Sequence, residues 1–73
     1  MTRTEHLLWS KNRAFEILDN GGSSVDAYTS FTSDMKKHPQ TENHLGIDMG
    51  LMLVIAGKLN TPDEMRKFIE GFN

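Results

Sequence analysis

His44 and Asp48 are the two residues whose types and spacing come nearest to a catalytic pair. They are four residues apart, and this spacing places two side chains on the same face of a helix. A carboxylate beside a histidine can orient the imidazole as a general base or as a metal ligand. No serine or cysteine nucleophile in a recognisable motif accompanies the pair, so a hydrogen bond on a helix surface explains it more simply. We therefore predict that the chain has no catalytic residue and is not an enzyme.

Segment 38–44, HPQTENH, is a second candidate site, because His38, Glu42 and His44 could each bind a metal ion. A zinc site needs three or four converging ligands, and the familiar ligand spacings are missing from this segment. A helix that ends at the proline, followed by a newly capped helix, explains the same residues without a metal. No Lys-Ser or Lys-Thr pair follows the glycines at 21–22, as it would in a phosphate-binding loop. We predict no metal and no cofactor.

Aromatic and basic side chains are stronger candidates, in this case for binding a partner. Trp9 lies off the apolar stripe of the helix predicted around it, and close to Arg13. Two interpretations stay open: another helix covers Trp9, or the ring is an exposed anchor, since tryptophan and arginine are typical of binding hot spots. The methionines are either core filler or the lining of an adaptable groove. The residues that we predict to bind a partner are Trp9, Arg13, Tyr28, Lys36 and Lys37.

Four helices must position these side chains, and the sequence marks their ends. Thr2 and Thr61 each precede a glutamate by three residues, which is the spacing of a capping box. The serines at 23–24 and Thr41 can cap the second and third helices, and glycine or proline follows each of the first three. No segment alternates with the period of a strand, so we predict a single all-α domain over residues 1–73, a bundle of four helices in two hairpins. The predicted helices span residues 3–20, 24–38, 42–56 and 62–72.

The third predicted helix carries the most apolar run of the chain, residues 49–56. This run is much shorter than the ~20 residues that a membrane span needs. Gly46 and Gly50 share one side of the helix, and a glycine inside a helix is unfavourable by up to ~1 kcal/mol unless another helix approaches closely. We therefore expect this helix to be central and the most buried, with the first helix on its glycine side and Asp48 where it meets water. The side chains expected to fill its other directions are Ile47, Leu51, Val54 and Ile55.

Gly22, Ala27, Phe31 and Pro39 follow the spacing of the second half of a tetratricopeptide repeat. In that repeat a glycine opens the turn, a small residue allows close helix approach, an aromatic ring fills the groove and a proline closes the unit. The first half of the repeat pattern is not present. Any antiparallel helix pair uses such residues, so a chance match stays open.

Three stretches carry a resemblance to a known family: EHLLWSKNRA, SDMKKHPQTENH and GLMLVIAGKLNTPDEMRKFIEGFN. Together they cover most of the chain. With them, the chain resembles a family of very small helical proteins of T-even-type tailed phages that are encoded beside the UvsW recombination and repair helicase. The resemblance implies a helical interaction module, likened to half-tetratricopeptide and FF-type domains, with an accessory role in phage DNA replication, recombination and repair. It implies no catalytic residue.

Net charge and composition limit the classes of function that fit the chain and its location in the cell. The 73 residues carry a formal net charge of −2, whereas a nucleic-acid-binding domain usually has a basic excess or stripe. The chain has no cysteine, which suits a reducing cytoplasm. Polar and basic residues follow the short apolar run at 7–9, so we expect no signal peptide. We predict a cytoplasmic location, in the host cell if the chain is phage-encoded.

The combined prediction is a non-enzymatic protein–protein interaction module, monomeric and not bound to a membrane, that uses an apolar patch or groove between helices. Its partner would belong to the phage replication or repair machinery, with a UvsW-type helicase the first candidate by resemblance. Two alternatives stay open. One is inhibition of a host protein, which the sequence does not separate from the first prediction. The other is weak nucleic-acid binding through Lys11, Arg13, Lys36 and Lys37.

Overall fold

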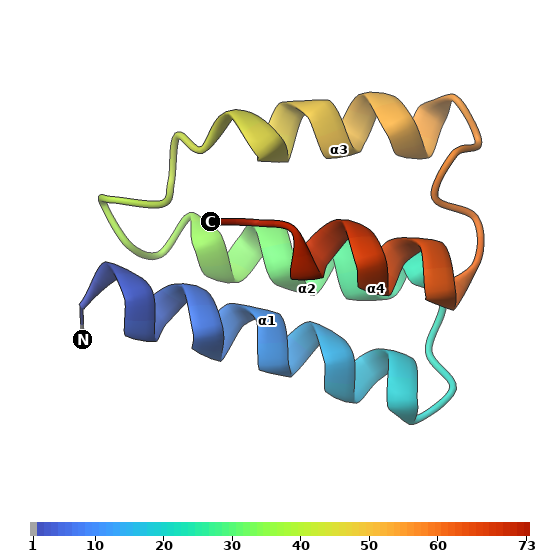
Figure 1. The fold of residues 1–73 in the computed structure, drawn as a ribbon, viewed down its shortest axis with the longest axis horizontal. Coiled ribbons are helices and arrows are strands. Elements are labelled where there is room, and N and C mark those ends of the chain that lie inside the picture. Colours follow the sequence, from blue (N-terminus) through green and yellow to red (C-terminus); the bar gives the residue numbers. More distant parts are fainter. Residues whose placement is uncertain (1) are drawn as a thin grey trace.

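Four α-helices form a small bundle in the computed structural model, which describes residues 2–73 (Figure 1). They are α1 (Arg3–Asp19), α2 (Ser24–Met35), α3 (Leu45–Ile55) and α4 (Pro62–Glu70). Figure 1 shows α1 and α3 on opposite sides of α2 and α4, which overlap in this view. The described residues contain no strand. The predicted all-α bundle of four helices is therefore confirmed.

The helix starts follow the capping chemistry read from the sequence in three of four cases. Both predicted capping boxes form, at the starts of α1 and α4: the Thr2 and Thr61 side chains each accept from the backbone N–H three residues on, and the glutamate there accepts from the backbone N–H of the cap. Ser23 caps α2 by accepting from the Asp26 N–H at 3.0 Å. Gly21, with φ +83°, makes the turn between α1 and α2.

The junction between α2 and α3 differs from the prediction. Helix α2 ends at Met35 rather than at residue 38, and α3 begins at Leu45 rather than at residue 42. The predicted cap, Thr41, is fully buried and its hydroxyl donates to the Met35 carbonyl instead. Thr41 therefore closes the last turn of α2, whose end carbonyls have no partner within the helix. The N-cap of α3 is His44.

The core lies where α1, α2 and α4 meet. Ala14 of α1 and Ala27 of α2 have no exposed surface, and such small residues let two helices pack closely. The Phe31 ring meets the edge of the Phe72 ring, with centroids 4.8 Å apart. The buried hydrophobic residues are Leu7, Ala14, Leu18, Ala27, Tyr28, Phe31, Met35, Ile47, Leu59, Met65, Ile69 and Phe72.

Helix α3 lies on one side of the bundle, and the prediction that it is central and the most buried was wrong. Only two of its residues, Ile47 and Gly50, are buried. The first helix does not cover its glycine side, because α2 and α4 lie between α1 and α3 (Figure 1). Of the side chains expected to fill its other directions, Leu51 and Ile55 are exposed. Asp48 is exposed, as predicted.

The glycines of α3 do mark a close approach, but by aromatic rings rather than by a helix backbone. A Cβ built on Gly50 would lie 2.6 Å from Tyr28 Cε1 and 2.8 Å from Phe68 Cε2. A Cβ built on Gly46 would lie 2.7 Å from two atoms of the Phe72 ring. These rings come from α2 and from the α4 end of the chain. No helix within residues 2–73 is long and apolar enough to cross a membrane; α3 itself has 11 residues.

Candidate interaction surface

Three of the predicted partner-binding residues come together around a buried carboxylate. Asp34, near the end of α2, has a side chain only 2% exposed. It accepts from Arg13 Nε at 2.7 Å and from Lys37 Nζ at 3.1 Å. Both cations also lie near the Trp9 ring, with the guanidinium carbon 4.9 Å and the ammonium nitrogen 5.9 Å from its centroid. We call Trp9, Arg13, Asp34 and Lys37 the ion cluster.

The ion cluster joins α1 to α2. Trp9 and Arg13 lie one turn apart on α1, whereas Asp34 lies at the end of α2 and Lys37 lies just beyond that end. Trp9 is half-buried, and the His6 ring is 5.4 Å from it. Trp9 therefore lies between the two open interpretations: it is neither fully covered nor fully exposed, and two cations and an imidazole flank the indole. Because the buried carboxylate binds both cations, we interpret the cluster first as a joint within the fold.

Tyr28 and Lys36, the other two predicted binding residues, lie apart from this cluster. Lys36 follows α2 and is exposed. Tyr28 is only 7% exposed, and its hydroxyl donates to the Ile47 carbonyl of α3. A surface role for Tyr28 is therefore wrong: the ring fills the space beside Gly50. Burial, and then the nearby Asp48 carboxylate, raise the pKa of the Tyr28 phenol, because both disfavour the charged form.

Tyr28→Phe should make the fold less sensitive to alkali. A group whose pKa is higher in the folded state contributes stability below its unfolded pKa of 10.0, and that contribution is lost as the pH rises through the folded pKa. We expect the variant to lose about 1 kcal/mol at pH 7 with its hydrogen bond. Above pH 10 the difference in free energy of unfolding between the wild type and the variant should become smaller. Urea unfolding from pH 7 to 11 measures this difference. A difference that stays constant over this range would show that ionisation of Tyr28 does not affect stability.

His44 has a structural role that the sequence did not indicate. Its Nδ1 accepts from the Gly46 N–H at 2.9 Å, which caps α3, and its Nε2 donates to the Asn73 carbonyl at 3.1 Å. Its ring lies 4.9 Å from the Phe72 ring. Because both ring nitrogens are used, none is left for Asp48, and the predicted hydrogen bond of this pair was wrong. The same bonds leave no free nitrogen to act as a base.

His44→Ala should weaken α3 selectively, whereas His44→Asn should not. The alanine variant removes the cap, and the loss of an N-cap typically lowers stability by about 1 kcal/mol. Asparagine caps helices well through its side-chain oxygen. We expect amide exchange in α3 to accelerate in the alanine variant and to stay near the wild-type rate in the asparagine variant. Equal rates in both variants would show that the imidazole is not the cap.

The described residues do not assemble a metal site. Among residues 2–73, no group of three or more histidine, aspartate and glutamate side chains could hold a metal ion. Within the segment first considered, His44 caps α3, while the His38 ring lies 5.0 Å from the His6 ring. His6 Nε2 in turn is 2.6 Å from the Asp34 carbonyl, which accepts from it. These histidines thus take part in helix contacts.

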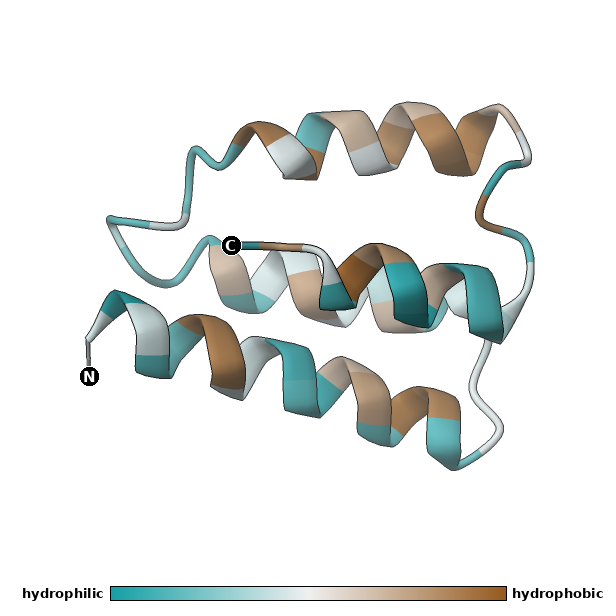
Figure 2. Cartoon of the chain, viewed as in Figure 1, coloured by the Kyte–Doolittle hydropathy of each residue, from teal (hydrophilic) through white to brown (hydrophobic). Residues whose placement is uncertain are grey.

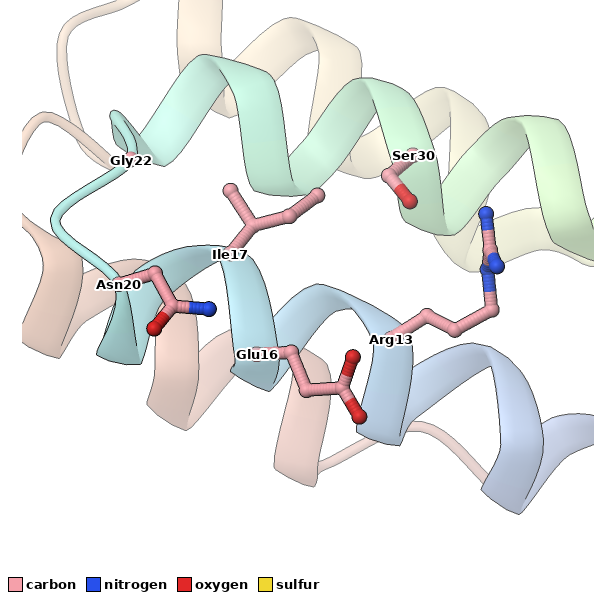
Figure 3. Close-up of a pocket in the computed structure, with 6 residues that line it drawn as sticks. All are labelled: Arg13, Glu16, Ile17, Asn20, Gly22 and Ser30. Carbon is pink, nitrogen blue, oxygen red and sulfur yellow. The ribbon is translucent and has the colours of Figure 1, made fainter.

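A polar pocket of about 370 Å³ lies between α1 and α2 (Figure 3). Figure 3 shows the Ile17 side chain pointing from α1 toward α2, with Arg13 reaching α2 beyond Ser30. The lining includes the Ser30 hydroxyl and the Glu16 carboxylate but no histidine. The lining residues are Arg13, Glu16, Ile17, Asn20, Gly22 and Ser30.

The outward side of α3 is the largest feature that the sequence interpretation missed. Five large apolar side chains there are 51 to 79% exposed, which leaves on the order of 500 Å² of apolar surface to water. At 100° per residue they span an arc of about 160°, interrupted only by Asp48. Apolar patches of this size on a monomer are often binding sites. Figure 2 shows the hydrophobic colour along this helix. We call these residues the α3 face: Leu45, Met49, Leu51, Met52 and Ile55.

The sequence did hold a signal for the α3 face. A helix that is apolar on all sides has to be covered on all sides, and a chain of 73 residues buries only about 60% of its unfolded surface. Such a chain has few elements with which to surround a helix.

Comparison of the chain with protein-family models, with curated proteins and with solved structures gives no match. The resemblance to small proteins of T-even-type phages therefore stays a prediction, carried by the three stretches quoted above.

Proposed function

We propose that this chain is a non-enzymatic protein–protein interaction module that binds its partner through the α3 face. The observation that carries the proposal is the exposure of five large apolar side chains on one helix of 11 residues. Burying apolar surface is the main driving force of protein association. Methionine is flexible and polarisable, so Met49 and Met52 can adapt to the shape of a partner.

The resemblance supports a partner in phage DNA replication, recombination or repair, and makes a UvsW-type helicase the first one to test. The cysteine-free chain fits action in the cytoplasm. A host protein that this chain inhibits would use the same α3 face, so the two proposals differ in the partner and not in the surface.

Nucleic-acid binding gains no support from the positions of the basic residues. The Lys11 ammonium donates to the carbonyls of Glu70 and Phe72, and Arg13 and Lys37 bind Asp34. Burial lowers the pKa of Lys11, an effect that the Glu70 carboxylate opposes. Three of the four predicted cations thus already have partners within the fold.

Ile55→Glu tests the proposal, with Asn12→Glu as its control. Both positions are exposed on helices and receive the same new charge, but only Ile55 belongs to the α3 face. We expect Ile55→Glu to weaken binding of a purified UvsW-type helicase at least about tenfold, since a charge would enter an apolar interface. The control should bind as the wild type does. Both variants should melt within a few degrees of the wild type, as surface substitutions usually do.

If the helicase does not bind, the same pair of variants can be used as baits in infected-cell lysate. A partner held by the wild type and by Asn12→Glu, but lost from Ile55→Glu, would place its binding on the α3 face. If no protein distinguishes the two baits, the proposal is wrong.

A further inference from the structure

A groove runs along the side of α3 that faces the α4 end of the chain. One hollow of about 390 Å³ lies between Met49 of α3 and the rings of Phe68 and Phe72. A second hollow of about 320 Å³ continues along α3 past Met52 and Leu53. Met49 lines both hollows, so they are adjacent along α3. We call the two hollows together the α3–α4 groove.

The length and lining of the groove suit a helix. Helix α3 has 11 residues, which at 1.5 Å per residue is a length of about 16 Å, or three helical turns. Amphipathic helices bind in such apolar grooves through side chains at positions i, i+3, i+4 and i+7. Met49 and Met52 give the lining the adaptability that helix-binding grooves often use.

The charges at the groove have one sign. Lys67 of α4 lines the first hollow and Lys58 lines the second, and no carboxylate lines either one. Asp48 of α3 lines neither hollow, although it lies only about 40° around the helix from Met52, four residues on. A partner that lies in the groove therefore meets two lysines, and complementary charge favours its association.

We propose that the α3–α4 groove binds an amphipathic helix of a partner protein whose apolar stripe is flanked by aspartate or glutamate. The inference rests on the proposed function, because the groove shares Met49 and Met52 with the α3 face. A second copy of this chain fits the groove less well, since the exposed side of its own apolar helix offers a single carboxylate, Asp48.

Two synthetic peptides of about 16 residues can test the charge preference. Both carry leucines at i, i+3, i+4 and i+7 in a helix-forming background, one with glutamates and the other with lysines beside the leucine stripe. We expect the glutamate peptide to bind the wild-type chain about tenfold more tightly, and added salt to reduce the difference. The amide signals of Met49, Met52, Leu53 and Phe68 should shift on titration.

Charge reversal in the groove supplies the matched control. Lys58→Glu with Lys67→Glu should reverse the preference to the lysine peptide, whereas Lys36→Glu, an exposed lysine at the end of α2, should leave it unchanged. The inference is overturned if neither peptide binds, if both bind equally, or if the shifted signals lie elsewhere. Self-association through the groove, seen as a concentration-dependent sedimentation coefficient that the same double variant abolishes, would also overturn it. The proposed function fails separately, through Ile55→Glu and its control.

Discussion

Gly50→Leu will destabilise the fold by about 3 kcal/mol or more, which is the upper end of the effect of overpacking a core. The first atom of the new side chain would lie 2.6 Å from Tyr28 Cε1 and within 2.9 Å of two atoms of the Phe68 ring. The Tyr28 ring cannot easily move aside, because its hydroxyl is bound to the Ile47 carbonyl. For a domain of this size, each kcal/mol corresponds to a fall of about 4–8 °C in melting temperature.

Gly50→Ala separates the steric effect from helix propensity. Alanine stabilises a helix interior by about 1 kcal/mol relative to glycine, so propensity alone would raise the melting temperature. We expect it to fall instead, because the alanine Cβ meets the same rings. Gly71→Ala is the control: the nearest atom to a Cβ there, outside the chain neighbours, is 3.5 Å away. An unchanged melting temperature in Gly50→Leu would show that the rings do not hold α3 in place.

The parts of the fold that follow from neighbouring residues could be predicted. A threonine three residues before a glutamate satisfies orphan N–H groups by local geometry alone, so Thr2 and Thr61 were identified as caps. Thr41 has the same local chemistry, but its hydroxyl donates to the Met35 carbonyl behind it. Sequence spacing does not tell in which direction a hydroxyl will bond. His44 was missed for the converse reason, since a neutral imidazole caps a helix less commonly than a hydroxyl or carboxamide.

The position of α3 depends on which other elements pack around it. The spacing of residues in the sequence does not reveal these neighbours. The glycine pattern correctly indicated a close approach at Gly50, and aromatic side chains from two elements supply it. The same pattern suggested a whole helix packed on that side. Periodicity records which side chains are apolar, but not whether the chain has enough elements to cover them. The five residues of the α3 face are exposed for that reason.

For the ion cluster, the sequence predicts only the contacts between residues of the same helix. Trp9 and Arg13 are four residues apart on α1, so their proximity follows from helical spacing. Asp34 and Lys37 join them only because α1 and α2 pack side by side, which brings residues 21 positions apart into an ion pair. The sequence therefore identified Lys37 as one of a basic pair at the end of α2, and the structure shows that the buried carboxylate of Asp34 binds it.

Removing both cations from the ion cluster should destabilise the fold by more than the two single losses together. In Arg13→Met or Lys37→Met, the Asp34 carboxylate keeps one cation, and we expect a loss of about 1 kcal/mol in each. In the double variant a carboxylate only 2% exposed keeps neither. An uncompensated buried charge is strongly destabilising, so we expect a loss of about 3 kcal/mol. Methionine retains the apolar part of both side chains, so packing against Trp9 changes little.

Adding Asp34→Asn to the double variant tests the cause. The amide has nearly the same shape as the carboxylate but carries no charge, so much of the lost stability should return, although Asp34→Asn alone should destabilise the wild type. Urea unfolding of the wild type, Asp34→Asn, the double variant and the triple variant measures the coupling between Asp34 and the two cations. Additive single losses, or no recovery with asparagine, would mean that water rather than the two cations compensates the charge of Asp34. The joint between α1 and α2 would then depend on the apolar packing of Ala14, Ala27 and Phe31 and on the hydrogen bond from His6 to the Asp34 carbonyl.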